Sequence, residues 1–173
     1  HLTKLTTYST GKYMVLDSST RRNLELCETL REKQKRGSLL WVLDKTKTAM
    51  GARLLRKYVE QPLIDKEEIT KRLDAVEELV KEAISREEIR EYLSSVYDLE
   101  RLVGRISYQS ANPRDLTAFK ASLSMLPHIR TILGDMKSPL LQKLYDDIDP
   151  LEDLCSLVEN AIIDDPPMAM KEG

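Results

Sequence analysis

The stretch SLLWVLDKTKTAMGARLLRKYVEQPL, from Ser38 to Leu63, holds the densest apolar run of the chain, Leu39 to Leu43, and its only tryptophan, Trp41. After a polar break, apolar residues return three or four positions apart, at Met50, Leu54, Leu55 and Tyr58. This spacing predicts a helix with one buried face, and it places Arg53, Arg56 and Lys57 on the other face.

The two ends of this helix are marked by residue type. Thr48 is a candidate N-cap, because its hydroxyl can accept a hydrogen bond from an amide of the first turn. Gln61-Pro62 is expected to end the helix, since proline lacks the amide proton. Gly51 lies inside the pattern, where glycine costs about 1 kcal/mol relative to alanine. It indicates either the close passage of another backbone or an ordinary flaw in the helix.

The residues before this stretch are less regular. Residues 1–12 read as a lead-in that belongs partly to a preceding connector region. Tyr13 to Asp17 predicts a short strand or an extended strap, and the alternation of Leu24 and Leu26 with polar residues favours a second extended piece. The charged run Arg31 to Arg36 predicts a solvated loop.

Beyond Pro62 the pattern is helical. Asp65 and Glu68 form a capping box, and the next helix is expected to bury a stripe of Ile69, Leu73, Val76, Val80 and Ala83 or Ile84. Ser85 to Glu88 repeats the capping box and predicts a new helix start. Asp98 is expected to cap a further helix with Leu99, Leu102, Val103 and Ile106 on its buried side.

The strongest helix start is Asn112-Pro113-Arg114-Asp115, with Asn as N-cap and Pro at the first helical position. The buried stripe expected there is Leu116, Phe119, Leu123, Leu126, Ile129 and Leu133, with a kink or break near Leu126 because of Pro127, and a stop at Gly134. Shorter helices are expected to open at Ser138-Pro139 and at Asp149-Pro150, the latter burying Leu151, Leu154, Leu157, Val158, Ala161 and Ile162. Asp164 to Pro167 ends the last helix, and Met168 to Gly173 is expected to be irregular or a short strand.

The composition fits one water-soluble helical domain of 173 residues, 41% apolar and 32% charged. The predicted fold class is all-α, an irregular multi-helix bundle with one or two short extended segments near the N-terminus. Lysine and arginine number 27 against 29 acidic residues. That balance argues against a nucleic-acid surface spread over the whole chain, although it leaves room for a small contact. No apolar run approaches membrane-spanning length.

Candidate chemical residues are few, and we expect no catalytic, cofactor-binding or metal-binding residue in this chain. Cys27 and Cys155 match no ligand or redox spacing and are interpreted as ordinary thiols. His1 and His128 are the only histidines, and His128 lacks a ligand partner at helical spacing. The acidic group Asp146, Asp147 and Asp149 lacks the pattern of a calcium loop. Ser18, Ser19 and Thr20 with Arg21 and Arg22 form the one basic loop that could touch phosphate, against an ordinary turn stabilised by Asp17 and Asn23.

Several of these segments together resemble the core domain of the MutS family of DNA mismatch repair proteins. The matching segments are YMVLDSSTRRNLEL (Tyr13 to Leu26), GSLLWVLDKTKTAMGARLLRKYVEQPL (Gly37 to Leu63), Ile69 to Leu79, Tyr97 to Ile106, Ala111 to Leu123 and Ala161 to Pro167. They cover nearly the whole chain in order, so residues 13–173 are interpreted as a partial helical core domain.

The resemblance implies a mechanical part that links the connector, the DNA clamp and the ATPase of a longer protein and transmits conformational change between them. Trp41, Leu43, Met50, Leu54 and Leu55 would then hold the joint together, with Gly51 allowing close helix approach. The resemblance implies ATP and Mg²⁺ only for the absent ATPase domain. The partners implied are the remaining MutS domains, a second subunit, mismatched double-stranded DNA and a downstream repair factor, in the cytoplasm at the bacterial nucleoid.

The departures from the family pattern are equally informative. No Phe-x-Glu mismatch-reading motif and no P-loop occur in this chain. Because the chain begins at His1 and ends at Gly173 without a terminating feature, we expect a piece of a longer protein with an apolar face exposed. The alternative interpretation is a self-contained helical adaptor that binds partner helices, and an all-helical enzyme is disfavoured by the poverty of histidine.

Overall fold

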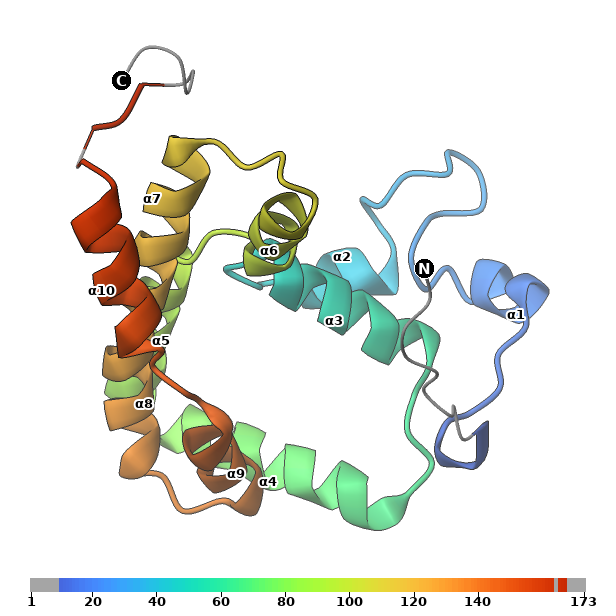
Figure 1. Ribbon diagram of the computed structural model, residues 1–173. Coiled ribbons are helices and arrows are strands. Elements are labelled where there is room, and N and C mark those ends of the chain that lie inside the picture. The colour runs from blue at the N-terminus through green and yellow to red at the C-terminus, as the bar shows by residue number, and fades with distance from the viewer. Residues whose placement is uncertain (1–9, 164, 168–173) are drawn as a thin grey trace. The chain divides into compact units, whose positions relative to one another are not determined.

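The computed structural model describes residues 10–163 and 165–167, and the regular structure within those ranges is helical (Figure 1). The helices are η1 (Thr10–Lys12, a 3-10 helix), α1 (Ser18–Asn23), α2 (Leu39–Leu43), α3 (Ala49–Glu60), α4 (Lys66–Lys81), α5 (Ala83–Ser94), α6 (Leu99–Ser107), α7 (Pro113–Leu123), α8 (Leu126–Gly134), α9 (Pro139–Asp147) and α10 (Glu152–Ala161). The predicted all-α class is confirmed. Most of the lead-in and the tail from Met168 to Gly173 lie outside the described residues.

The chain divides into two compact units, and each is described by itself. Unit 1 comprises the described residues 10–45 and 52–70, and unit 2 comprises residues 46–51 and the described part of 71–173. The boundaries fall inside α3 and α4, so these two helices contribute residues to both units.

Unit 1 is built on a small core of Leu26, Leu40 and Val59. The predicted strap is present as an extended segment after η1. Its Met14 amide donates to the carbonyl of Pro62 at 2.8 Å, and Tyr13 forms an isolated antiparallel bridge with Leu63. These bonds hold the chain beside the end of α3.

Two expectations for unit 1 are wrong. The segment around Leu24 is not extended, because Asp17 caps α1 by accepting a hydrogen bond from the Thr20 amide at 2.6 Å, and the basic residues Arg21 and Arg22 become the last turn of this helix. The chain then reverses through Glu25, whose φ is +49°. Local capping therefore replaces both the predicted turn and the second extended piece.

The expected packing of the Ser38–Leu63 stretch also needs correction. Trp41, Leu43 and Leu54 are each about half exposed, whereas Leu40 and Val59 are buried. A helix of five residues such as α2 turns only one position fully toward a core, and here that position is Leu40. The apolar run is thus longer than the face that unit 1 can cover.

The N-terminal turn of α3 explains Gly51. Thr48 caps the helix as predicted, with its hydroxyl accepting from the Gly51 amide at 2.9 Å. A Cβ built on Gly51 would lie 3.0 Å from that hydroxyl, and its other near neighbours are side-chain atoms of Thr46. The glycine makes room for its own cap, and the predicted close approach of a second backbone is wrong at this position.

Unit 2 has the larger core, formed by Ala75, Ile129, Leu133, Met136 and Leu141. The helix pairs that pack together are α7 with α10, α8 with α9, α5 with α8, and α6 with α7, and Figure 1 shows α10 lying along α7. Leu123 and Ser122 of α7 are almost fully buried.

The helix starts in unit 2 follow their capping residues in most cases. Asn112 caps α7 in a reciprocal capping box with Asp115, and Asp98 caps α6. The predicted break is present, because α7 ends at Leu123 and α8 begins at Leu126 with Pro127 in its first turn. The predicted start at Ser85 is wrong: α5 begins at Ala83, and Glu82 at the N-cap position makes no side-chain capping bond.

Candidate functional site

The outward face of α4 is the feature that departs most from the sequence prediction. The predicted buried stripe is exposed: Leu73, Val76 and Val80 have relative exposures of 62%, 57% and 62%. The core instead receives Ala75, at 4%, and the half-buried Leu79. Residues 73, 76 and 80 recur at three- and four-residue intervals and share one side of the helix. Unit 2 therefore presents an apolar helix face, named here the α4 face, with nothing from the described part of unit 2 covering it.

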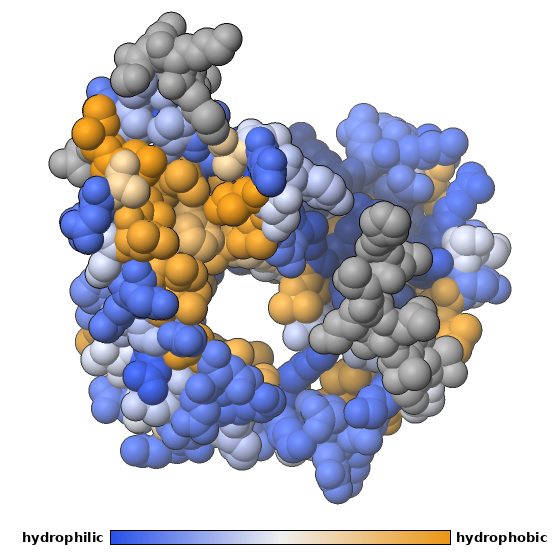
Figure 2. All heavy atoms as spheres, in the orientation of Figure 1, coloured by the Kyte–Doolittle hydropathy of each residue, from blue (hydrophilic) through white to orange (hydrophobic). Residues whose placement is uncertain are grey.

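A second apolar surface lies on α10. Leu154 and Leu157 were predicted to be buried but are exposed, and Ile163 just beyond the helix is 69% exposed. Figure 2 shows apolar side chains gathered over α7 and α10. Single exposed leucines are ordinary, but contiguous apolar surface marks a site of interaction with another protein surface.

Glu78 fixes α4 to the rest of unit 2. Its carboxylate accepts hydrogen bonds from the backbone amides of Lys137 and Ser138, at 2.5 and 2.7 Å. Burial raises the pKa of Glu78, but the two backbone donors outweigh it, so the net pKa lies below its ordinary value. Ser138 is the N-cap residue of α9, but its side chain makes no capping hydrogen bond. The Glu78 carboxylate therefore supplies the hydrogen-bond acceptor at the start of that helix.

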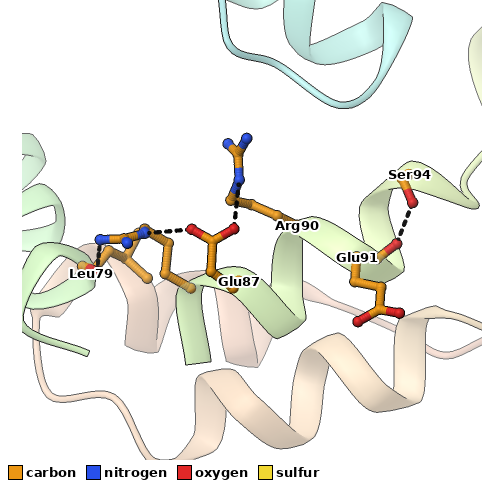
Figure 3. Close-up of polar contacts among 6 residues, drawn as sticks. Leu79, Glu87, Arg90, Glu91 and Ser94 are labelled. Atoms are coloured by element: carbon orange, nitrogen blue, oxygen red, sulfur yellow. Dashed lines mark hydrogen bonds and ion pairs between the residues drawn. The ribbon is translucent and has the colours of Figure 1, made fainter. Parts of the chain in front are cut away.

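Arg86 joins the end of α4 to α5. Its guanidinium donates to the Leu79 carbonyl at 3.2 Å and to the Glu87 carboxylate at 3.2 Å. Figure 3 shows Glu87 and Arg90 on the same helix, with Leu79 nearby. The other Glu87 oxygen pairs with Arg90 at 3.3 Å. The Leu79 carbonyl belongs to the last turn of α4, where carbonyls lack helical partners and favour cations. The group stabilises the short connection between the two helices.

Asp115 performs the same task for α6 and α7. It is buried, and its carboxylate accepts from Arg105 at 2.6 Å and from the Asn112 amide at 3.1 Å. The first bond comes from the last turn of α6 and the second closes the capping box of α7. Sequence reasoning found the capping box but missed the Arg105 partner.

The two cysteines are unpaired thiols in the structure. Burial raises the pKa of Cys27, and the Glu60 carboxylate, which accepts from its Sγ at 3.4 Å, raises it further. A thiol held protonated is a poor nucleophile and a poor metal ligand. Cys155 lies 3.6 Å from the Ser124 hydroxyl.

The remaining sequence candidates are dispersed. His128 stacks on Tyr92, with ring centroids 4.9 Å apart. Asp147 accepts from Lys143 at 2.6 Å, while Asp149 accepts from the Leu151 amide at 3.0 Å. Within residues 10–163 and 165–167, no three His, Cys, Asp or Glu side chains converge to hold a metal ion. No helix in the same residues is long and apolar enough to cross a membrane. His1 and Asp164 lie outside the described residues.

The two hollows of interest differ in chemistry. A hollow of about 440 Å³ in unit 2 is lined by neutral residues at the end of α5 and just after it, and at the end of α7 and just after it. They are Ser94, Ser95, Val96, Tyr97, Ala121, Ser124 and Met125. A cleft of about 190 Å³ in unit 1 is lined by Ser18, Arg21, Arg22, Cys27, Glu28, Arg56 and Glu60. The second cleft does place the Cys27 thiol against the Glu60 carboxylate, but the raised pKa of Cys27 keeps that thiol protonated.

Comparison with known proteins shows the family to which the chain belongs. The family model described as MutS domain III matches residues 19–173. The chain belongs to the MutS domain III family. Over all 173 residues it is 64% identical to the DNA mismatch repair protein MutS of Lachnoclostridium phytofermentans, and 52% and 50% identical to the MutS proteins of Ruminiclostridium cellulolyticum and Halothermothrix orenii. It spans only 19% to 20% of the length of these relatives.

Membership of the MutS domain III family confirms the resemblance drawn from the segments between Tyr13 and Pro167. The relatives that match the chain are named DNA mismatch repair proteins. Unit 2 presents two apolar surfaces, on α4 and on α10, and its helices are joined by the polar contacts of Glu78, Arg86 and Asp115. Sequence reasoning missed Glu78 as part of that frame, because its partners lie 59 and 60 residues away.

Proposed function

We propose that this chain is the structural junction of a longer mismatch-repair protein and has no catalysis of its own. It links the connector, DNA-clamp and ATPase parts and transmits conformational change between them. ATP and Mg²⁺ would act in the ATPase part, and mismatched double-stranded DNA, a second subunit and a downstream repair factor would be partners of the whole protein. The place of action would be the bacterial cytoplasm, at the nucleoid.

The observation that carries this proposal is the α4 face. Side chains at Leu73, Val76 and Val80 are more than half exposed, while the opposite side of the same helix is packed. Burying each such side chain fully contributes about 1.5–3 kcal/mol. A helix with two apolar sides is expected to lie between two packed layers, and relatives that are about five times longer supply enough chain for the second layer.

Transmission requires rigid elements that move as units. Glu78, Arg86 and Asp115 each fix a helix end to its neighbour by bonds to backbone or to a buried charge. Elements fixed in this way shift between discrete packings rather than bending continuously. The same apolar face would also serve a self-contained adaptor for partner helices. We favour the junction, because the matching relatives carry this segment inside much longer chains.

The test is made in the full-length protein that contains this chain, with Val80→Glu as the variant. Mismatched DNA should still bind and ATP should still be hydrolysed, but the change in hydrolysis rate on adding mismatched DNA should be lost. Asp74→Asn is the control, because Asp74 is exposed on a side of α4 away from Leu73 and Val80, and this variant should keep the response. A full response in a folded Val80→Glu protein would contradict the proposal.

A further inference from the structure

The charge of the chain is divided unequally between the two units. Among described residues, unit 1 carries 12 lysines and arginines against 9 acidic residues, a formal charge of +3. Unit 2 carries 13 against 18, a formal charge of −5. The near-neutral total that argued against a nucleic-acid surface is therefore the sum of a basic unit and an acidic one. Such asymmetry directs an anionic partner to unit 1.

Three of the twelve basic residues of unit 1 line the 190 Å³ cleft. Arg21 and Arg22 come from the last turn of α1, and Arg56 comes from α3. Two carboxylates, Glu28 and Glu60, also line the cleft. Glu60 is already engaged, since it accepts from the Arg56 Nε at 2.9 Å and from the Cys27 thiol at 3.4 Å. The guanidinium groups of Arg21 and Arg22 therefore dominate the charge of this cleft.

The loop that leaves the cleft extends the positive surface. It begins at Glu28 and carries Arg31, Lys33, Lys35 and Arg36, all of them exposed, against two acids, Glu28 and Glu32. Lys35 pairs with Asp44 at 2.5 Å, which fixes one point of the loop to the end of α2. Figure 2 shows hydrophilic side chains over this part of the molecule. The result is a series of cations spaced along a surface rather than one closed pocket.

We propose that the cleft of unit 1 and the 31–36 loop together contact the phosphate backbone of DNA, without reading its sequence. A regularly charged polyanion matches a series of spaced cations, and guanidinium groups bind phosphate oxygens in pairs. Backbone contacts of this kind position a protein on DNA and carry no base information. The contact is additional to the junction role, which stands if the contact is disproved.

The experiment measures binding of the 173-residue chain to a fluorescent duplex of about 20 base pairs by fluorescence anisotropy. The salt concentration is varied from about 25 to about 200 mM, because the electrostatic screening length is about 10 Å near 0.1 M and changes over this range. We expect weak binding in the range of about 10⁻⁶ to 10⁻⁴ M, the same for matched and mismatched duplex. The double variant Arg21→Gln/Arg22→Gln should lower affinity at least about fivefold and reduce the slope of log K against log salt by about 2, since each phosphate contact contributes about 0.9.

The matched control is Arg90→Gln/Arg101→Gln, which removes one partly exposed and one exposed arginine from the acidic unit 2 and should change neither quantity. Circular dichroism establishes that both variants are folded. The proposal is overturned if the wild-type chain shows no salt-dependent binding, or if the two double variants weaken binding equally. It is also overturned if polyglutamate of equal charge competes as well as unlabelled duplex, since the partner would then be an acidic protein.

Discussion

Replacing Glu78 with glutamine tests whether α4 is fixed to the start of α9 by a single carboxylate. The wild-type oxygens accept from the amides of Lys137 and Ser138 at 2.5 and 2.7 Å. Glutamine has one acceptor oxygen, so one amide would lose its bond and face an amide nitrogen instead. Hydrogen bonds to a charged group contribute about 1.5–3 kcal/mol each, and partial solvent access places the expected loss near the lower end, about 1.5 kcal/mol.

The dependence of stability on pH provides a second test of the role of Glu78. Burial raises the pKa of Glu78, and backbone donation from Ser138 and Lys137 more than offsets it, so the folded-state pKa is depressed. The contribution of this carboxylate to stability is therefore fully present above the unfolded value, about 4.3, and is lost as pH falls through the folded pKa. The side chain of the Glu78→Gln variant does not titrate, so the variant should lack this part of the acid-induced loss.

The assay is urea unfolding followed by circular dichroism between about pH 3 and pH 7, a range that brackets the ordinary pKa of glutamate. The control is Glu77→Gln, which removes an exposed carboxylate paired with Lys81 at 2.5 Å on the same helix and should change stability little. The reasoning is refuted if the two variants are equally stable, or if the Glu78→Gln protein keeps the wild-type dependence on pH in the acidic half of that range.

Three further predictions concern other parts of unit 2. Asp115→Ala should cost about 2–3 kcal/mol in urea unfolding, because it removes the Arg105 bond together with the half of the capping box in which the Asp115 carboxylate accepts from the Asn112 amide. The exposed Asp135→Ala is the control, and an equal effect would count against the account. Gly104→Ala should raise stability by about 1 kcal/mol, since a Cβ there meets nothing within 4 Å and glycine weakens a helix interior; a lowered melting temperature would show otherwise. The isolated chain should self-associate at high concentration through its apolar faces, and Leu73→Glu/Val80→Glu should reduce this in sedimentation; a wild-type chain that stays monomeric contradicts that expectation.

Features governed by neighbouring residues were predictable from the sequence. Thr48, Asp98 and Asn112 each act as a cap, because a side-chain oxygen and the amide it accepts from lie within three positions. The break before Leu126 followed from Pro127 in the same way. The positions of these helix ends depend on neighbouring residues and not on distant parts of the chain.

Features governed by distant partners were not predictable. The α4 stripe of Leu73, Val76 and Val80 is the strongest apolar pattern on that helix, yet unit 2 buries Ala75 and Leu79 instead. Periodicity shows that a face is apolar but does not show which layer covers it. In the sequence, Glu78 cannot be distinguished from the other acidic residues of a helix surface. Its role is visible only in the structure, where Lys137 and Ser138 lie beside it. The charge division between the units likewise needs the fold, because α3 and α4 cross the boundary.

The central claim is that the α4 face packs against other parts of a longer protein. Its most direct test is the rate of thiol labelling at Val80→Cys, read by mass spectrometry of the peptide, in the 173-residue chain and in the full-length protein. Asp74→Cys reports the general accessibility of the same helix, because Asp74 is exposed and lies one position from Leu73 and six from Val80, on another side of α4. The account predicts rapid labelling of position 80 in the isolated chain and slow labelling in the full-length protein, with position 74 labelled faster there. Equal and rapid labelling of position 80 in both proteins would contradict it.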